Sequence, residues 1–132
     1  MSEENVEIVR GFIDAYNRRD FDAAIESFDP EIDFVLPAHQ SADSGRGPDA
    51  VIRFFEGLDE TFDDVQLQPQ EYVDGGDRVA TRLRHYAHGK GSGLVLDEEL
   101  YHQVTTFRDG TIVRIEYFTD WSAALEAAGL SE

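Results

Sequence analysis

The chain lacks cysteine and holds a single methionine, a single tryptophan and a single lysine, Lys90, in 132 residues. The absence of cysteine excludes a thiol nucleophile and a disulfide framework. No apolar run approaches the roughly 20 residues of a membrane-spanning helix, so a membrane is not expected as a partner. Residues 1–5 are polar and acidic, unlike a signal peptide, which predicts a cytoplasmic protein. The length predicts one domain, residues 1–132, with a single core.

Basic residues are scarce: 11 Lys and Arg face 28 Asp and Glu, for a formal net charge of −17. Nucleic acid is not expected as a partner, because phosphate binding needs a basic surface. An acidic chain with almost no lysine has two explanations. One is adaptation to high salt, where dense carboxylates keep a protein in solution. The other is arginine-rich codon usage with an ordinary acidic surface, which we favour on composition alone.

Apolar residues at helical spacing predict two helices before the first strand. The longer helix contains residues 6–16, and Asp20 is placed to cap a shorter one over residues 21–28. Asp29-Pro30 ends this second helix. Residues 32–36 then alternate between apolar and polar, as a half-buried strand does.

The remaining chain predicts one further long helix followed by strands. Pro48 suits the first turn of that helix, and from Val65 onward the apolar period changes to two. The later strands are predicted at Arg78–His88, Leu96–Phe107 and Thr111–Phe118. Two helices, a strand, a third helix and then strands predict an α+β fold, with a strongly curved sheet and helices on one face.

Four segments carry a resemblance to a known family. They are Ala15–Ala23, Asp29–Phe34, Gly45–Val51 and Phe107–Val113, the last followed by Tyr117 and Asp120. In this order and spacing they resemble the NTF2-like superfamily, within it the SnoaL-like and ketosteroid-isomerase-related group. The resemblance implies a cone with a mostly antiparallel sheet wrapped around helices, and an internal pocket for a small hydrophobic molecule. It also implies a homodimer through the outer face of the sheet and no cofactor.

The family hosts isomerases, cyclases, epoxide hydrolases, dehydratases and proteins without catalysis, so the fold does not give the function. The family's isomerases use a carboxylate base, a tyrosine and a protonated aspartate. By comparison with them, the base position holds Leu36 or Val35, the tyrosine position Phe12 and the acid position Gln103. Leucine and phenylalanine transfer no proton, which argues against steroid-type isomerisation.

The Asp-Arg-Asp set of the family's epoxide hydrolases falls on His85, Leu83 and Tyr117, which argues against that mechanism as well. The polar residues left for chemistry are His85, Gln103 and Tyr117, with Tyr16 as a further candidate. His85 is the predicted general acid or base, Tyr117 is the predicted donor to a developing oxyanion, and Gln103 is predicted to orient either His85 or the ligand. Such a set would serve an enolisation, an aldol cyclisation or a dehydration.

The predicted pocket is otherwise mostly apolar. His39 is predicted at its mouth, because it lies in the unpatterned loop before Pro48. A metal is not predicted, because His85 and His88 point to opposite faces of one strand, and His88 and His102 are expected to face outward. The residues predicted to line the pocket are Phe12, Tyr16, Phe34, Leu36, His39, Phe54, Phe55, Leu58, Leu83 and Tyr101.

Three functions remain open at this point. The chain is an isomerase, cyclase or dehydratase that acts through His85, a ligand-binding protein without turnover, or a structural dimer whose cavity is filled by its own phenylalanines. A single histidine on a mixed strand face is more often a hydrogen-bonded core residue than a catalyst. An open cavity would argue against the structural dimer, and a buried imidazole with satisfied hydrogen bonds would favour binding over catalysis.

Overall fold

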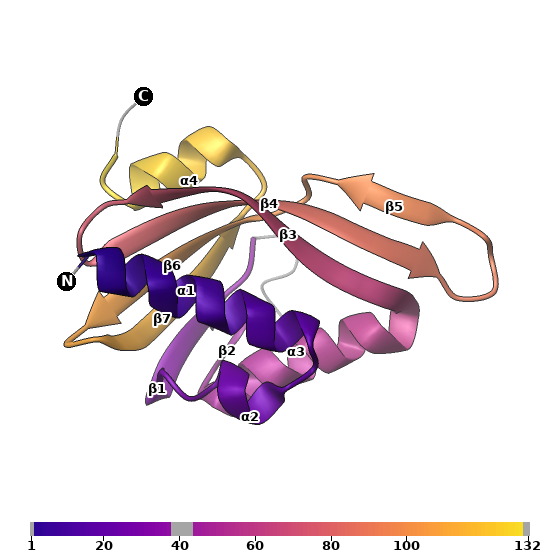
Figure 1. Cartoon of the computed structure of the whole chain (residues 1–132), viewed down its shortest axis with the longest axis horizontal. Helices are drawn as coiled ribbons and strands as arrows, with labels where there is room; N and C mark the ends of the chain where they lie inside the picture. The colour runs from indigo at the N-terminus through magenta and orange to yellow at the C-terminus, as the bar shows by residue number, and fades with distance from the viewer. Residues whose placement is uncertain (1, 38–43, 131–132) are drawn as a thin grey trace.

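The computed structural model of the chain describes residues 2–37 and 44–130 (Figure 1). Two helices, α1 and α2, precede the first strand, and a third helix precedes a run of strands, as the sequence predicts. The elements are α1 (Ser2–Asn17), α2 (Phe21–Ala24), β1 (Phe28–Val35), β2 (Gly45–Arg46), α3 (Pro48–Thr61), β3 (Phe62–Asp74), β4 (Arg78–Gly89), β5 (Val95–Glu98), β6 (His102–Arg108), β7 (Thr111–Phe118) and α4 (Trp121–Ala127).

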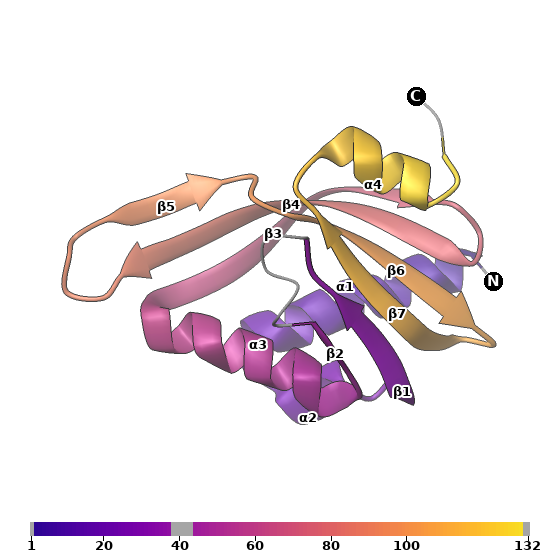
Figure 2. The ribbon, with the colours of Figure 1, turned by 180° about the vertical axis from the view of Figure 1, so that it is seen from behind.

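The strands form one curved sheet in the order β2-β1-β7-β6-β4-β3, with β5 paired to β4. β1 runs parallel to β7, and the other neighbouring pairs are antiparallel. The helices α1 and α3 cover the concave face, whereas α4 packs on the opposite face against β4, β6 and β7 (Figures 1 and 2). The predicted α+β class is confirmed, but the prediction that helices pack on one face alone is wrong. No helix among the described residues is both long and apolar enough to cross a membrane.

The second helix is shorter than predicted and the first strand longer. Asp20 caps α2 as predicted, because its carboxylate accepts the N–H of Ala23 at 3.2 Å. The helix nevertheless ends at Ala24, and β1 begins at Phe28. Phe28 pairs with Ile112 of β7, and the Ile112 N–H donates to the Ser27 carbonyl at 2.8 Å. Pairing with β7 therefore overrides the helical spacing of the local sequence.

A bulge changes which side chains of β7 reach the core. Thr106 of β6 pairs with Arg114, but its neighbour Phe107 pairs with Ile112, so Val113 is the extra residue. Simple alternation predicts Val113, Ile115 and Tyr117 on the inner face. The structure buries Ile112, Ile115 and Tyr117 in the core, and Val113 is only half-buried.

The long strand predicted at Leu96–Phe107 is two strands in the structure. β5 pairs with β4, and β6 pairs with both β4 and β7, while residues 99–101 between them belong to no strand. The β4–β5 hairpin, together with β3 along its other side, extends beyond β1, β2, β6 and β7 (Figure 2). Residues of the hairpin line a cavity.

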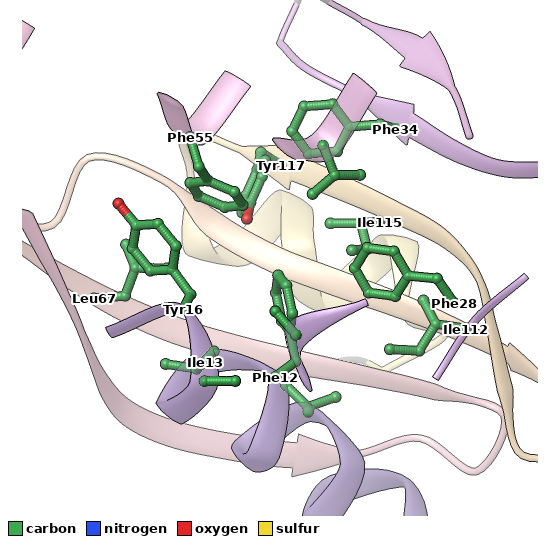
Figure 3. Packing of buried hydrophobic residues seen from close by; sticks show 14 of the residues in the cluster. Phe12, Ile13, Tyr16, Phe28, Phe34, Phe55, Leu67, Ile112, Ile115 and Tyr117 are labelled. Atoms are coloured by element: carbon green, nitrogen blue, oxygen red, sulfur yellow. The ribbon is translucent and has the colours of Figure 1, made fainter. Parts of the chain in front are cut away.

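The main core lies between the concave face and the helices α1 and α3. Figure 3 shows the rings of Phe12, Tyr16 and Phe55 gathered there; the Tyr16 and Phe55 ring centroids are 4.3 Å apart. A second, smaller cluster lies under α4. His102 belongs to this outer face, as predicted, but it is only 4% exposed, because Trp121 covers it with its ring centroid 5.4 Å away.

Candidate functional site

A cavity of about 240 Å³ lies between α3 and the strands β3 and β4, at the end of the sheet where β5 diverges. Its wall is mostly apolar and aromatic, and among the described residues its lining contains no Asp, Glu, Lys or Arg. The lining residues are Phe54, Phe55, Leu58, Phe62, Val65, Leu67, His85, Tyr86, Ala87, Leu96, Leu100, Tyr101 and Tyr117.

The structure brings about half of the predicted site residues to this cavity. His85, Tyr117, Phe54, Phe55, Leu58 and Tyr101 line it. Phe12, Tyr16, Phe34, Leu36, Leu83 and Gln103 are buried in the core but are not part of the lining. His39 lies outside the described residues.

The lining residues that sequence reasoning missed come from β3 and the β4–β5 hairpin. Val65 and Leu67 were visible as alternating apolar positions, so their inward direction was predictable in principle. Leu96 and Leu100 were not, because Leu96 lies beside the lining residue Ala87 only through the β4–β5 pairing, and Leu100 lies in the break between β5 and β6.

His85 is a buried and neutral polar group of the cavity. Its side chain projects from β4 and is 9% exposed. The backbone N–H of Leu100 donates to its Nδ1 at 3.3 Å, and the ring meets Tyr101 edge-on with centroids 5.7 Å apart. Burial lowers the pKa of His85 to about 4, although a hydrogen bond with the Glu98 backbone acts in the opposite direction. The ring is therefore neutral at pH 7, with Nδ1 as an acceptor and the proton on Nε2.

Tyr117 is held by a buried chain of hydrogen bonds. Its hydroxyl donates to Gln103 Oε1 at 2.8 Å, and Gln103 Nε2 donates to Thr105 Oγ1 at 3.0 Å. Burial raises the pKa of Tyr117 above its usual range. The hydroxyl proton is thus directed at Gln103, and Gln103 orients Tyr117 from behind the cavity wall.

The end of α1 holds the β3 wall. The side chain of Asn17 makes two bonds of 2.9 Å with the backbone of Leu67, one to its carbonyl and one from its N–H. Arg19 forms an ion pair with Asp59 of α3 at 2.9 Å and donates to the Val65 carbonyl at 2.8 Å. Of the three polar residues at and just after the end of α1, Asn17, Arg18 and Arg19, two therefore fix the position of lining residues.

Tyr16 lies beside Asn17 and Arg19, the two residues that clamp the β3 wall. It is fully buried, and burial raises its pKa to about 12. The Arg19 guanidinium stacks on its ring at 4.5 Å from the centroid. Its hydroxyl has no hydrogen-bond partner among the described residues.

Within the same residues, no three His, Asp or Glu side chains are placed to hold a metal ion.

Residues 9–115 of the chain match the model of the SnoaL-like domain family. The chain belongs to the SnoaL-like domain family. The resemblance predicted from the four sequence segments is thereby confirmed. A comparison with curated proteins found no match for this SnoaL-like protein.

Solved structures with the same fold are only distantly related in sequence. An NTF2-like protein of unknown function from Burkholderia pseudomallei is 22% identical, with 93% of this chain and 95% of that chain covered and a TM-score of 0.77. TerC, co-crystallised with polyporic acid, is 21% identical, with 96% and 98% covered and a TM-score of 0.74. A protein of Catenulispora acidiphila with a ketosteroid isomerase-like fold, in complex with trimethylamine, is 19% identical, with 94% and 93% covered and a TM-score of 0.73.

Proposed function

We propose that this SnoaL-like protein binds a small, uncharged and largely apolar molecule in the cavity, and that His85 donates a hydrogen bond from Nε2 to an acceptor oxygen of that molecule. The observation that carries the proposal is the neutral, buried imidazole in a wall that is otherwise mostly apolar and aromatic. Because Nδ1 accepts the Leu100 N–H, the neutral ring carries its proton on Nε2, and the proposal requires that this N–H turn to the ligand and not to the Glu98 carbonyl.

The wall also supports an uncharged ligand. Burying a charge without a partner is costly, and the lining among the described residues offers none. The net charge of −17 further disfavours the approach of anions. The volume of about 240 Å³ is slightly below the range of pockets that hold drug-sized molecules, which favours a smaller ligand. TerC and the Catenulispora protein, which have similar folds, were crystallised with small molecules.

Acid–base catalysis is the second candidate, because His85 and Tyr117 border the same cavity. It would make the protein a cofactor-free isomerase, cyclase or dehydratase with His85 as the base. Two features place it second. A base whose pKa is about 4 is weak at neutral pH, and the Tyr117 proton is engaged by Gln103.

The binding test uses two probes of similar shape, acetophenone, which carries a carbonyl, and ethylbenzene, which does not. We expect acetophenone to bind more tightly in an NMR titration, and His85→Leu to remove the difference between the two probes. Leu58→Trp, which fills the cavity, should abolish binding. Leu94→Trp is the matched control, because Leu94 is 63% exposed and lies outside the cavity lining. Failure of both probes to bind, or binding that survives Leu58→Trp, would refute the proposal.

The same probe separates binding from catalysis. Exchange of the acetophenone methyl protons in deuterated water reports enolisation. If the wild type accelerates this exchange and His85→Leu abolishes the acceleration, the protein acts as a base on carbon acids. Binding without accelerated exchange supports a binding protein.

The homodimer stays a proposal as well. α4 covers part of the outer sheet face, over β4, β6 and β7, so a dimer would have to use the rest of that face or the helix itself. Light scattering of the purified chain decides between one copy and two.

A further inference from the structure

The ladder of β4 is interrupted where the strand passes the cavity. Residues 78–81 pair with β6, and residues 85–88 pair with β5. Between these stretches, residues 82–84 lie opposite residues 99–102, of which residues 99–101 belong to no strand. Buried backbone N–H groups need acceptors, so this gap raises the question of what satisfies the N–H groups on its two sides.

Two imidazoles take the place of the missing backbone acceptors, one on each face of the sheet. His85, on the cavity face of β4, accepts the N–H of Leu100 at Nδ1 over 3.3 Å. His102, on the outer face at the start of β6, accepts the N–H of Leu83 at Nδ1 over 3.3 Å. His85 therefore joins β4 to the segment between β5 and β6, and His102 joins the start of β6 to β4.

We propose that His102, which lies outside the cavity, is a positioning residue for it: together with His85 it holds the Glu99–Tyr101 segment against β4, and protonation of either ring at Nδ1 releases that segment. Leu100 and Tyr101 belong to the cavity lining, so the released segment is part of the cavity wall. A protonated Nδ1 is a donor and repels the N–H that it previously accepted.

Burial favours the neutral forms of the two rings in the folded protein. His85 meets Tyr101 and shares the cavity with Tyr117, while the lining from α3 is apolar. His102 is covered by Trp121 and has the Glu99 carboxylate 3.9 Å from Nε2. Burial lowers the pKa of both rings; for His102, Glu99 and Asp120 oppose this effect and Arg82 adds to it.

This inference rests on the proposed function only where it concerns ligand binding, because the hold itself exists without a ligand. Amide hydrogen exchange of Leu83 and Leu100 in the ligand-free full chain therefore tests it directly. We expect both amides to be protected at pH 7. As the pH falls to about 4, the pKa of His85, the Leu100 amide should lose protection relative to the amides of β6 and β7, and the Leu83 amide should do so when His102 takes up its proton.

Paired variants separate positioning from general stability. His102→Leu removes the acceptor and should speed exchange at Leu83 about tenfold. His102→Asn keeps an oxygen acceptor near the position of Nδ1 and does not titrate, so it should preserve protection of Leu83 and remove its pH dependence. His88→Asn is the control. His88 lies on β4, the strand that carries His85, and its side chain is 39% exposed. This variant should change the exchange of neither the Leu83 nor the Leu100 amide.

Unchanged protection of the Leu83 amide in His102→Leu would overturn the inference. A pH dependence of Leu83 protection that persists in His102→Asn would overturn it as well. If His102→Leu does not fold, the His102→Asn profile alone decides. Loss of acetophenone binding with normal exchange in the wild type would count against the proposed function and leave the histidine pair standing.

Discussion

The cavity has two walls that are held in different ways. The β3 wall is held by hydrogen bonds from the amide of Asn17 and the guanidinium of Arg19. The opposite wall, at residues 99–101, is held by the neutral rings of His85 and His102. One cavity therefore has a wall whose hold does not depend on a histidine and a wall whose hold is lost when its histidines are protonated.

The pH dependence of the free energy of unfolding should be largest for the wall held by His85 and His102. The unfolded chain binds a proton at His85 below about pH 6.5, whereas the folded protein does so below a pKa of about 4. The unfolded state thus binds more protons between these values, so stability falls as the pH falls. Urea unfolding should show that the wild type loses about 3 kcal/mol more than His85→Asn between these two pH values. Parallel pH profiles of the two proteins would contradict this.

The clamp at β3 should give a smaller and pH-independent effect. Arg19→Ala removes the ion pair with Asp59, the bond to the Val65 carbonyl and the stacking on Tyr16. We expect a loss of about 2 kcal/mol in the free energy of unfolding, equal at about pH 5 and at neutral pH. Arg18→Ala, whose side chain is 56% exposed, should change it by less than about 0.5 kcal/mol. Equal effects of the two variants would remove the distinction between them.

A substitution at Asn17 separates the two hydrogen bonds that its side chain makes with the Leu67 backbone. Asn17→Asp keeps an acceptor for the Leu67 N–H but loses the donor to its carbonyl. The expected loss is about 1 kcal/mol at neutral pH by thermal unfolding. A loss as large as that of Asn17→Leu would show that both bonds depend on the amide donor.

Salt should have the smallest effect on the difference in stability between the Arg19 and Arg18 variants. The net charge of −17 makes the surface self-repelling, so about 1 M KCl should stabilise the protein by about 1 kcal/mol, with the Arg19 and Arg18 variants shifted alike. Unfolding at low ionic strength would instead indicate adaptation to a high-salt habitat. Indifference to salt would show that the acidic composition has no bearing on stability.

Most of the fold was predictable because most local sequence signals agree with it. Asp20 caps the second helix, Pro48 begins the third, and Thr111–Phe118 is a strand with the predicted bounds. The errors come from long-range pairing. The bulge at Val113 depends on the register between β6 and β7, which alternation along one strand does not contain.

The site was only partly predictable for the same reason. Aromatic residues on the inner face of α3 follow from helical spacing, so Phe54, Phe55 and Leu58 were named in advance. Leu100 was not assigned to the cavity, because it lies in the break between β5 and β6; His102 was placed on the outer face, but its burial under Trp121 of α4 was not predicted. Neither event leaves a local pattern in the sequence.

The most direct test of the proposed binding site is the nitrogen-15 NMR spectrum of the His85 ring, with and without acetophenone at pH 7. The structure predicts a neutral ring with the proton on Nε2 and an unprotonated Nδ1, and a shift of the Nε2 resonance when the probe binds. A ring protonated at Nδ1, or an Nε2 resonance that does not respond to bound acetophenone, would contradict the proposal.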